Sequence, residues 1–177
     1  VHRALELVFF HNESIWPAKM KELISHSCSV IPDFITEKEE RSLLNEIEPH
    51  MKRLRYEKSH WDDYCGDVIS GMCLLSDAVL RLRHKDRKDE LIVDFFVPRR
   101  CLYRMGEYGR YEFTHEVLGK DESFFNGRPV PRDRRISVIC RDLPKAFVEA
   151  QERAKEIAAH SVGAKINGEA TQNEKLK

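Results

Sequence analysis

One short run, residues 134–141 with the sequence RRISVICR, constrains the fold of this chain more than any other. Three of its residues, Ile136, Val138 and Ile139, are β-branched, and such residues favour strands. The run closes before Pro144, which is excluded from the interior of a sheet. This pattern predicts a β-strand.

The two faces of this strand differ in chemistry, because side chains alternate between the faces of a strand. Two guanidinium groups and a hydroxyl on one face suit a dicarboxylate, since arginine binds carboxylates through paired hydrogen bonds. An edge strand with a solvated basic face is the alternative, and the strand taken alone favours it. The residues that share this face are Arg135, Ser137, Ile139 and Arg141.

The rest of the chain predicts helices followed by short strands. Thr36 and Glu39 form a capping-box pattern that predicts the start of a helix, and Pro49 can begin a second short helix. From residue 68 onward, short β-rich runs alternate with polar turns. We therefore expect an α+β, mainly β fold: a sandwich or jelly roll with N-terminal support helices.

Composition sets the outer limits on function. Thirty basic residues balance thirty acidic ones, so the net charge does not support nucleic-acid binding. A basic cluster at positions 128, 132, 134 and 135 is flanked by acids, and a solvated loop is the simpler interpretation. No apolar run is long enough to span a bilayer. Five scattered cysteines predict neither a disulfide framework nor a zinc ribbon, and favour a reducing compartment.

A histidine adds a second candidate feature. Alternation puts His115 on the apolar face of a strand, together with Tyr111, Phe113 and Val117, so we expect it to point inward. A histidine in that position is most often an ordinary core residue. Two arginines are also expected to point inward, and they favour a metal ligand over a core residue. A histidine and an anion-binding arginine pair inside one sheet structure indicate a metal beside a carboxylate co-substrate.

Several motifs form a recognisable set. The set comprises Gly71-x-x-Leu74-Leu75-Ser76, Leu102-Tyr103 and the runs 110–116, 122–125 and 134–141, preceded by Pro32-x-Phe34, Glu48-Pro49, Arg55-Tyr56-Glu57 and His60-Trp61-Asp62. With these motifs the chain resembles the alkB-type dioxygenases that use Fe(II) and 2-oxoglutarate, and among them the mitochondrial branch of seventh alkB homologues. The resemblance covers most of residues 30–145 and implies a double-stranded β-helix (jelly-roll) dioxygenase core.

The resemblance also implies roles for individual residues. His115 would be the distal histidine of the iron site. Arg135 and Arg141 would hold the two carboxylates of 2-oxoglutarate, and Tyr103 and Ser137 would assist them. The face argument agrees, because residues six apart share one side of a strand.

One departure from the family affects the metal site. Iron in these enzymes is held by two histidines and a carboxylate. The His-x-Asp pair lies in a segment of several dozen residues that this chain lacks between positions 62 and 64, so the jelly roll is expected to be incomplete. His60 and Asp62 are candidate substitutes, since Asp62 lies 53 residues before His115. His84 and Asp86 form another such triplet in a polar turn, where a ligand pair is not expected.

These observations lead to two main hypotheses. The first is an Fe(II)- and 2-oxoglutarate-dependent dioxygenase that hydroxylates or demethylates a substrate; the resemblance implies mitochondria, regulated necrosis and fatty-acid metabolism. The second is a catalytically degenerate module that binds 2-oxoglutarate or a partner protein. A third is the product of an alternative or mispredicted transcript that folds poorly.

Organisation and location are predicted as follows. We expect a peripheral segment (1–28), a truncated dioxygenase domain (29–145) and a C-terminal helix with a disordered tail (146–177). No convincing transit peptide is present, so the cytoplasm is the alternative to mitochondria. The expected partners are 2-oxoglutarate and oxygen, with a protein substrate or partner left open and no membrane span. A monomer is expected.

Overall fold

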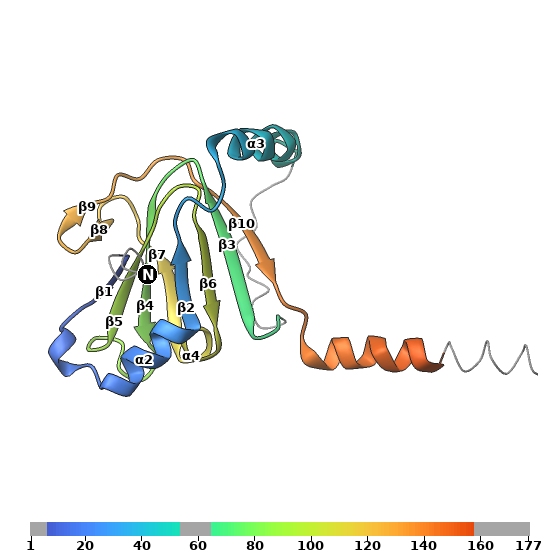
Figure 1. Ribbon diagram of the computed structural model, residues 1–177. Helices are drawn as coiled ribbons and strands as arrows, with labels where there is room; N and C mark the ends of the chain where they lie inside the picture. The colour runs from blue at the N-terminus through green and yellow to red at the C-terminus, as the bar shows by residue number, and fades with distance from the viewer. Residues whose placement is uncertain (1–6, 54–64, 158–177) are drawn as a thin grey trace, which may run out of the picture. The chain divides into compact units, whose positions relative to one another are not determined.

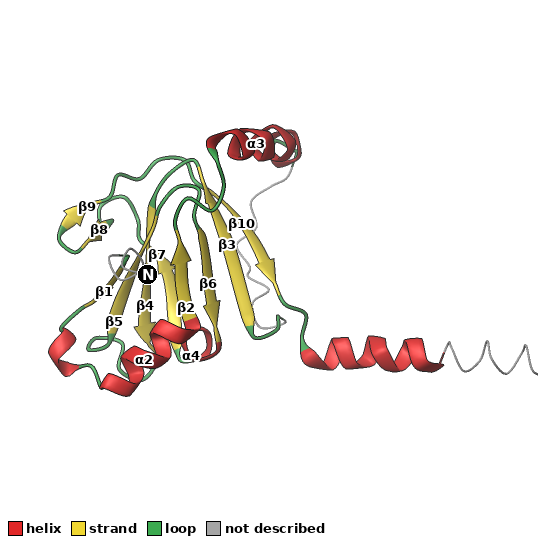
Figure 2. Ribbon diagram, viewed as in Figure 1, coloured by secondary structure: helices red, strands yellow, loops and turns green. Residues whose placement is uncertain are grey.

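The computed structural model describes residues 7–53 and 65–157. Contacts divide the chain into two units, Val1–Asp142 and Leu143–Lys177. The first unit combines helices with antiparallel sheets (Figure 1; Figure 2). A mixed helix and antiparallel-sheet fold is therefore confirmed.

Two four-stranded sheets dominate the first unit. The first has the order β1 (Val8–Phe10), β5 (Ile92–Val97), β4 (Ala78–His84) and β7 (Phe113–Val117). The second has the order β10 (Ile136–Arg141), β3 (Val68–Leu74), β6 (Leu102–Gly106) and β2 (Cys28–Ile31). A small hairpin, β8 (Phe124–Phe125) and β9 (Arg128–Pro129), lies between β7 and β10 along the chain. The predicted strand over residues 134–141 thus forms as β10.

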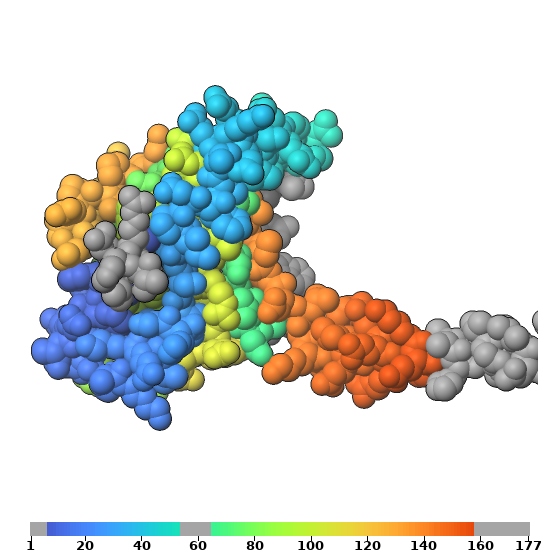
Figure 3. Space-filling view, viewed as in Figure 1, coloured from blue at the N-terminus to red at the C-terminus, as the bar shows by residue number. Residues whose placement is uncertain are grey.

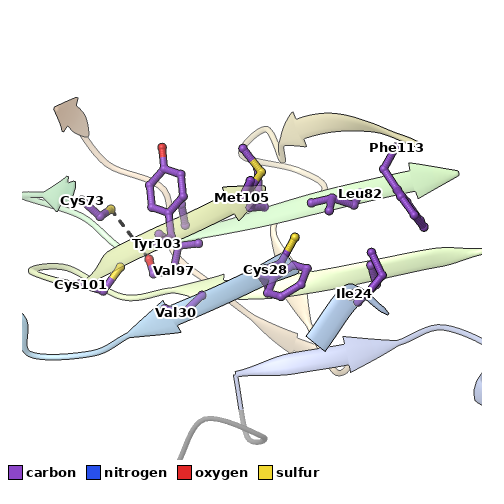
Figure 4. Packing of buried hydrophobic residues seen from close by; sticks show 14 of the residues in the cluster. Ile24, Cys28, Val30, Cys73, Leu82, Val97, Cys101, Tyr103, Met105 and Phe113 are labelled. Carbon is purple, nitrogen blue, oxygen red and sulfur yellow. Dashed lines mark hydrogen bonds between the residues drawn. The ribbon is translucent and has the colours of Figure 1, made fainter. Parts of the chain in front are cut away.

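The main core is made by residues from both sheets (Figure 4). Leu82 of β4, Phe113 of β7 and Cys73 of β3 are all less than 2% exposed, and they belong to one apolar cluster. Alternation along each strand selects the side chains that enter this cluster. The strands that bear the candidate residues therefore line a shared interior.

Four helical segments accompany the sheets of this unit in the described residues: a short 3-10 helix (Glu13–Ile15), α2 (Ala18–Ser27), α3 (Glu37–Met51) and α4 (Glu107–Tyr111). The capping box at Thr36 and Glu39 is confirmed. Pro49 lies inside α3 and does not begin a second helix. Residues 7–28, expected to be peripheral, supply β1, α2 and the buried Ile24.

A buried carboxylate attaches α3 to the strands. The Glu40 side chain is fully buried, and its Oε1 accepts a hydrogen bond from the Leu75 backbone nitrogen at 2.8 Å. Arg99 Nη2 lies 2.6 Å from Glu40 Oε2. An ionised group so deeply buried needs such partners, so this helix is fixed at the end of β3.

The second unit is described as far as residue 157. Residues 145–157 are helical, and the Pro144 carbonyl accepts the first hydrogen bonds, from the backbone nitrogens of Phe147 and Val148. This matches the helix expected from residue 146 as far as the description extends. Within the described parts of both units, no helix combines the length and the apolar character that crossing a membrane requires.

Candidate functional site

A row of paired residues runs across three strands of the second sheet. Gly71 of β3 lies opposite Ile139 of β10 on one side and opposite Tyr103 of β6 on the other. Ser137 lies opposite Cys73, two residues along the same strands. Directly paired residues point to the same face of a sheet, so Ser137, Ile139 and Tyr103 share the face that lines the core.

Gly71 lets Tyr103 cross the sheet. A Cβ atom at Gly71 would lie 2.1 Å from Tyr103 Cζ, which shows that the phenol ring lies directly over the glycine. The Tyr103 hydroxyl consequently reaches across β3 to β10, where it lies 2.8 Å from Ser137 Oγ. The sequence motifs contain both residues, but only the strand register explains why a glycine is required between them.

Arg135 has a thiol partner in this structure. Its Nε lies 3.1 Å from Cys73 Sγ, and both groups lie beside the row just described. Cys101 is next to Cys73, since the Cys73 backbone nitrogen donates to the Cys101 carbonyl at 3.0 Å, and Figure 4 shows both cysteines within the core. A hydrogen bond from Cys101 and the positive charge of Arg135 together lower the pKa of Cys73 to about 7, against the opposing effect of burial. Sequence reasoning missed Cys73, because nothing short of the register places it beside Arg135.

Arg141 ends β10 at the far end of this face. It pairs with Ile69 of β3 and is exposed. Six residues of strand separate it from Arg135 by about 20 Å. Arg141 therefore lies on the same face of β10 as Arg135, at the opposite end of the strand.

His115 lies on the other sheet. It pairs with the buried Leu82 of β4, so it is on the core-facing side of β7, the side that the alternation predicted. The side chain is nevertheless exposed, and its Nε2 lies 3.0 Å from the Gly109 carbonyl oxygen. Sequence alternation identified the face, but it could not show that this end of the sandwich is open.

A cavity of about 300 Å³ connects the two sheets near His115. Ile69, the cross-strand partner of Arg141, lines the same cavity. Its charged lining residues are Lys85 and Arg110, which are both cations. The cavity is therefore suited to an anion, and it brings His115 close to the Arg141 end of β10.

Iron ligands are a separate question. Within residues 7–53 and 65–157, no group of three His, Cys, Asp or Glu side chains could hold a metal ion. None of the described residues that line the cavity beside His115 carries a carboxylate. The described residues therefore do not fit the three-ligand iron site of the family. The candidate substitutes His60 and Asp62 lie outside the described residues.

The other His-x-Asp triplet has a structural role. His84 is buried at the end of β4, and its ring packs edge-on against Phe113 with centroids 5.1 Å apart. Its Nδ1 accepts a hydrogen bond from the Asp86 backbone nitrogen at 3.2 Å. His84 therefore lies buried in β4, whereas the sequence suggests a polar turn.

Comparison with known proteins gives the family. No family model matches the chain. The mitochondrial alpha-ketoglutarate-dependent dioxygenase alkB homolog 7 of Bos taurus is 31% identical over 176 residues, which cover 67% of this chain and 79% of the relative. The chain belongs to the alkB-type dioxygenase family.

Two further relatives support and extend this assignment. The alkB homolog 7 of Mus musculus is 30% identical with the same coverage, so the similarity is to the mitochondrial homolog 7 in particular. The uncharacterized protein L905 of Acanthamoeba polyphaga mimivirus is 27% identical over 135 residues, 75% of this chain and 61% of that protein.

The alignment lengths locate a difference in size. The bovine alignment extends over 176 residues but uses only 67% of this 177-residue chain, so the bovine protein has several dozen residues within it that lack a counterpart here. This agrees with the segment inferred to be missing. The viral alignment is 135 residues long and covers 75% of this 177-residue chain, so almost every aligned position is occupied by a residue of this chain. A stretch that covers this share of the chain must include residues 54–64. The viral relative therefore needs no such insertion.

Proposed function

We propose that this chain is an Fe(II)- and 2-oxoglutarate-dependent dioxygenase domain of the alkB type that binds 2-oxoglutarate on the face of β10. One observation supports this most directly: the Tyr103–Ser137 hydrogen bond and the half-buried Arg135 lie side by side on the core-facing side of one sheet. Hydroxyl and guanidinium donors that converge inside a sandwich suit a carboxylate. The jelly-roll fold of the family is part of this proposal, since two facing antiparallel sheets agree with it.

Each residue has a distinct role in the proposed site. Arg135 exchanges its contact with Cys73 for one carboxylate of 2-oxoglutarate, and the hydroxyls of Tyr103 and Ser137 donate to the same group. Arg141 holds the other carboxylate from the far end of the strand. His115 would be one ligand of Fe(II), while the remaining ligands would come from outside the described residues, with His60 and Asp62 as candidates.

The family reaction couples the conversion of 2-oxoglutarate to succinate with hydroxylation or demethylation of a substrate. We propose that the chain acts in mitochondria, because its relatives are named mitochondrial. The family resemblance extends this proposal to regulated necrosis and fatty-acid metabolism. Fractionation of cells that express the full natural protein tests the location. Recovery outside mitochondria would contradict it.

A second candidate is a module that binds 2-oxoglutarate or a partner protein without oxidising anything. Two observations favour it: the described residues contain no three-ligand cluster, and the homolog 7 relatives have an additional internal stretch. The viral relative lacks that stretch as well, which argues against an error in the transcript.

One experiment separates the two candidates. The full chain is purified anaerobically, 2-oxoglutarate binding is measured by calorimetry with and without Fe(II), and succinate is then assayed with oxygen. Iron-dependent succinate that disappears in His115→Ala supports the dioxygenase. Binding without succinate, lost in Arg135→Ala but kept in the adjacent Arg134→Ala, supports the binding module. Absence of 2-oxoglutarate binding by folded protein would overturn the dioxygenase and the 2-oxoglutarate-binding module, and would leave only a module that binds a partner protein.

A further inference from the structure

The segment between β7 and β10 is a structured part of the surface (Figure 3, light orange). Its β8–β9 hairpin turns at Asn126 and Gly127, which both have positive φ angles, as a tight hairpin turn requires. The Val130 backbone nitrogen donates to the Ser123 carbonyl at 2.8 Å. Val130 also packs with Leu118 and Val79 in a second apolar cluster. The segment is therefore held firmly against the sheets.

A cavity of about 400 Å³ lies on this segment. Phe124 and the prolines at 129 and 131 form apolar walls. Lys120, Ser123 and Arg132 contribute polar groups to the lining. Concave apolar walls with a few convergent polar groups are typical of small-molecule sites.

Two buried donors at this cavity have no acceptor. Ser123 is only 2% exposed, and its Oγ makes no hydrogen bond to any described residue. Arg132 Nη1 is also buried, and it too lacks a partner in the described part of the chain. A buried donor without an acceptor costs about 1–3 kcal/mol, so both groups gain from a ligand that accepts hydrogen bonds.

The charges at the cavity favour an anion. Arg132 and Lys120 form no ion pair with the carboxylates of the described residues, whereas the nearby Arg134 is paired with Glu48. Desolvation and the positive charge of Arg135 lower the pKa of Arg132, as expected for a cation that lacks a counter-ion. Asp121 is the only acidic side chain in the cavity lining, so the described lining has an excess of positive charge.

We propose that this cavity binds an oxyanion, the carboxylate or phosphate group of a small molecule, through Ser123, Arg132 and Lys120. The Ser123 hydroxyl and Arg132 Nη1 supply hydrogen bonds, and Lys120 adds charge at the rim. The lining of this cavity does not include Tyr103, Ser137 or Arg141, although the charges of Arg135 and Cys73 act on Arg132. Binding here requires neither iron nor the proposed oxidation, so its failure can be distinguished from failure of the proposed function.

The test uses the full chain with inorganic phosphate and butyrate as probes and with sodium chloride matched for ionic strength. We expect backbone amide NMR shifts in residues 119–132 that saturate with one of the two probes. Arg132→Gln should weaken binding at least tenfold, and Ser123→Ala should weaken it several-fold. Arg128→Gln removes the same charge from an exposed position in the same hairpin that does not line this cavity, and should leave binding unchanged.

The outcomes decide both the site and its ligand. Saturation by phosphate alone or by butyrate alone supports the site and identifies the group that it prefers. If Arg132→Gln fails to fold, Lys120→Gln at an exposed position supplies the same comparison. Shifts that chloride reproduces, an equal loss in Arg128→Gln, or shifts confined to β10 would overturn the proposal.

Discussion

The two regions that the family chemistry requires differ sharply in this chain. The face around Tyr103 and Ser137 is closed, hydrogen-bonded and packed into the core. The surroundings of His115 are open, and the cavity beside it is lined by Lys85 and Arg110. Under the proposed function, the first region would supply the donors for the co-substrate, while the second would supply a single metal ligand among the described residues.

This difference shows that the two halves of such a site depend on different parts of the chain. The proposed co-substrate face is built within β10, β3 and β6, and β3 pairs with both of the other strands. A metal site needs ligands from separate segments, and we expect the family ligand pair to lie in the stretch of the relatives that has no counterpart here. Loss of that stretch would remove metal ligands and leave the strands of the proposed co-substrate face in place.

The largest expected effect is on co-substrate binding. Arg135→Ala removes a charge-assisted, two-pronged interaction, and we expect 2-oxoglutarate binding to weaken by about 3 kcal/mol, on the order of a hundredfold. Calorimetry at constant pH measures the change. Arg134→Ala is the matched control, because Arg134 pairs with Glu48 and lies on the alternate face. Equal losses of 2-oxoglutarate affinity in the two variants would show that Arg135 has no particular role in binding the co-substrate.

The next effect concerns the glycine under the tyrosine. Gly71→Ala should lower the free energy of unfolding by about 1–3 kcal/mol, because its Cβ would meet Tyr103 Cζ at 2.1 Å. Denaturant unfolding measures this. Gly119→Ala is the control, since a Cβ there meets nothing within 4 Å, and it should change stability by less than about 0.5 kcal/mol. A Gly71→Ala protein as stable as Gly119→Ala would show that the ring does not need to cross the strand.

The sequence predicted one of these regions better than the other. Alternation within a strand is a local property, so the shared face of Arg135, Ser137 and Arg141 followed from residue spacing alone. The Arg135–Cys73 contact did not, because it depends on which strand lies beside β10. The exposure of His115 is also non-local, since it depends on what covers the end of the sandwich. Residues 7–28 had no clear period, yet pairing with β5 and β6 orders them.

A pH effect is expected at Cys73. The pKa of Cys73 is lowered from 9.0 to about 7 by the Cys101 hydrogen bond and the Arg135 charge, with Asp77 acting in the opposite direction. Between pH 7 and 9 the unfolded chain therefore holds more protons at this position than the folded chain. The contribution of Cys73 to stability should rise with pH across this window and be lost as the pH falls toward 7, while the raised pKa of its partner Cys101 opposes part of that rise.

Cys73→Ala tests this assignment, because it removes the thiolate that Arg135 accompanies. Denaturant unfolding at pH 7, 8 and 9 should give a flatter dependence in the variant than in the parent chain. Cys140→Ala, at an exposed position on the alternate face, is the control and should keep the parent slope. An unchanged slope in Cys73→Ala would mean that other groups set the pH dependence.

The smallest effect is expected at His115. Its side chain is exposed, and substitutions at exposed positions usually change stability little, so His115→Ala should change the free energy of unfolding by less than about 0.5 kcal/mol. Metal-free 2-oxoglutarate binding should stay within twofold of the parent value, because Arg135 and Ser137 lie on the other sheet. Calorimetry without metal, followed by titration of Fe(II), separates the two regions. A large loss of metal-free binding in His115→Ala would show that the open region and the closed face form one site before any metal is bound. A loss seen only with Fe(II) would show that the two regions are joined by the metal.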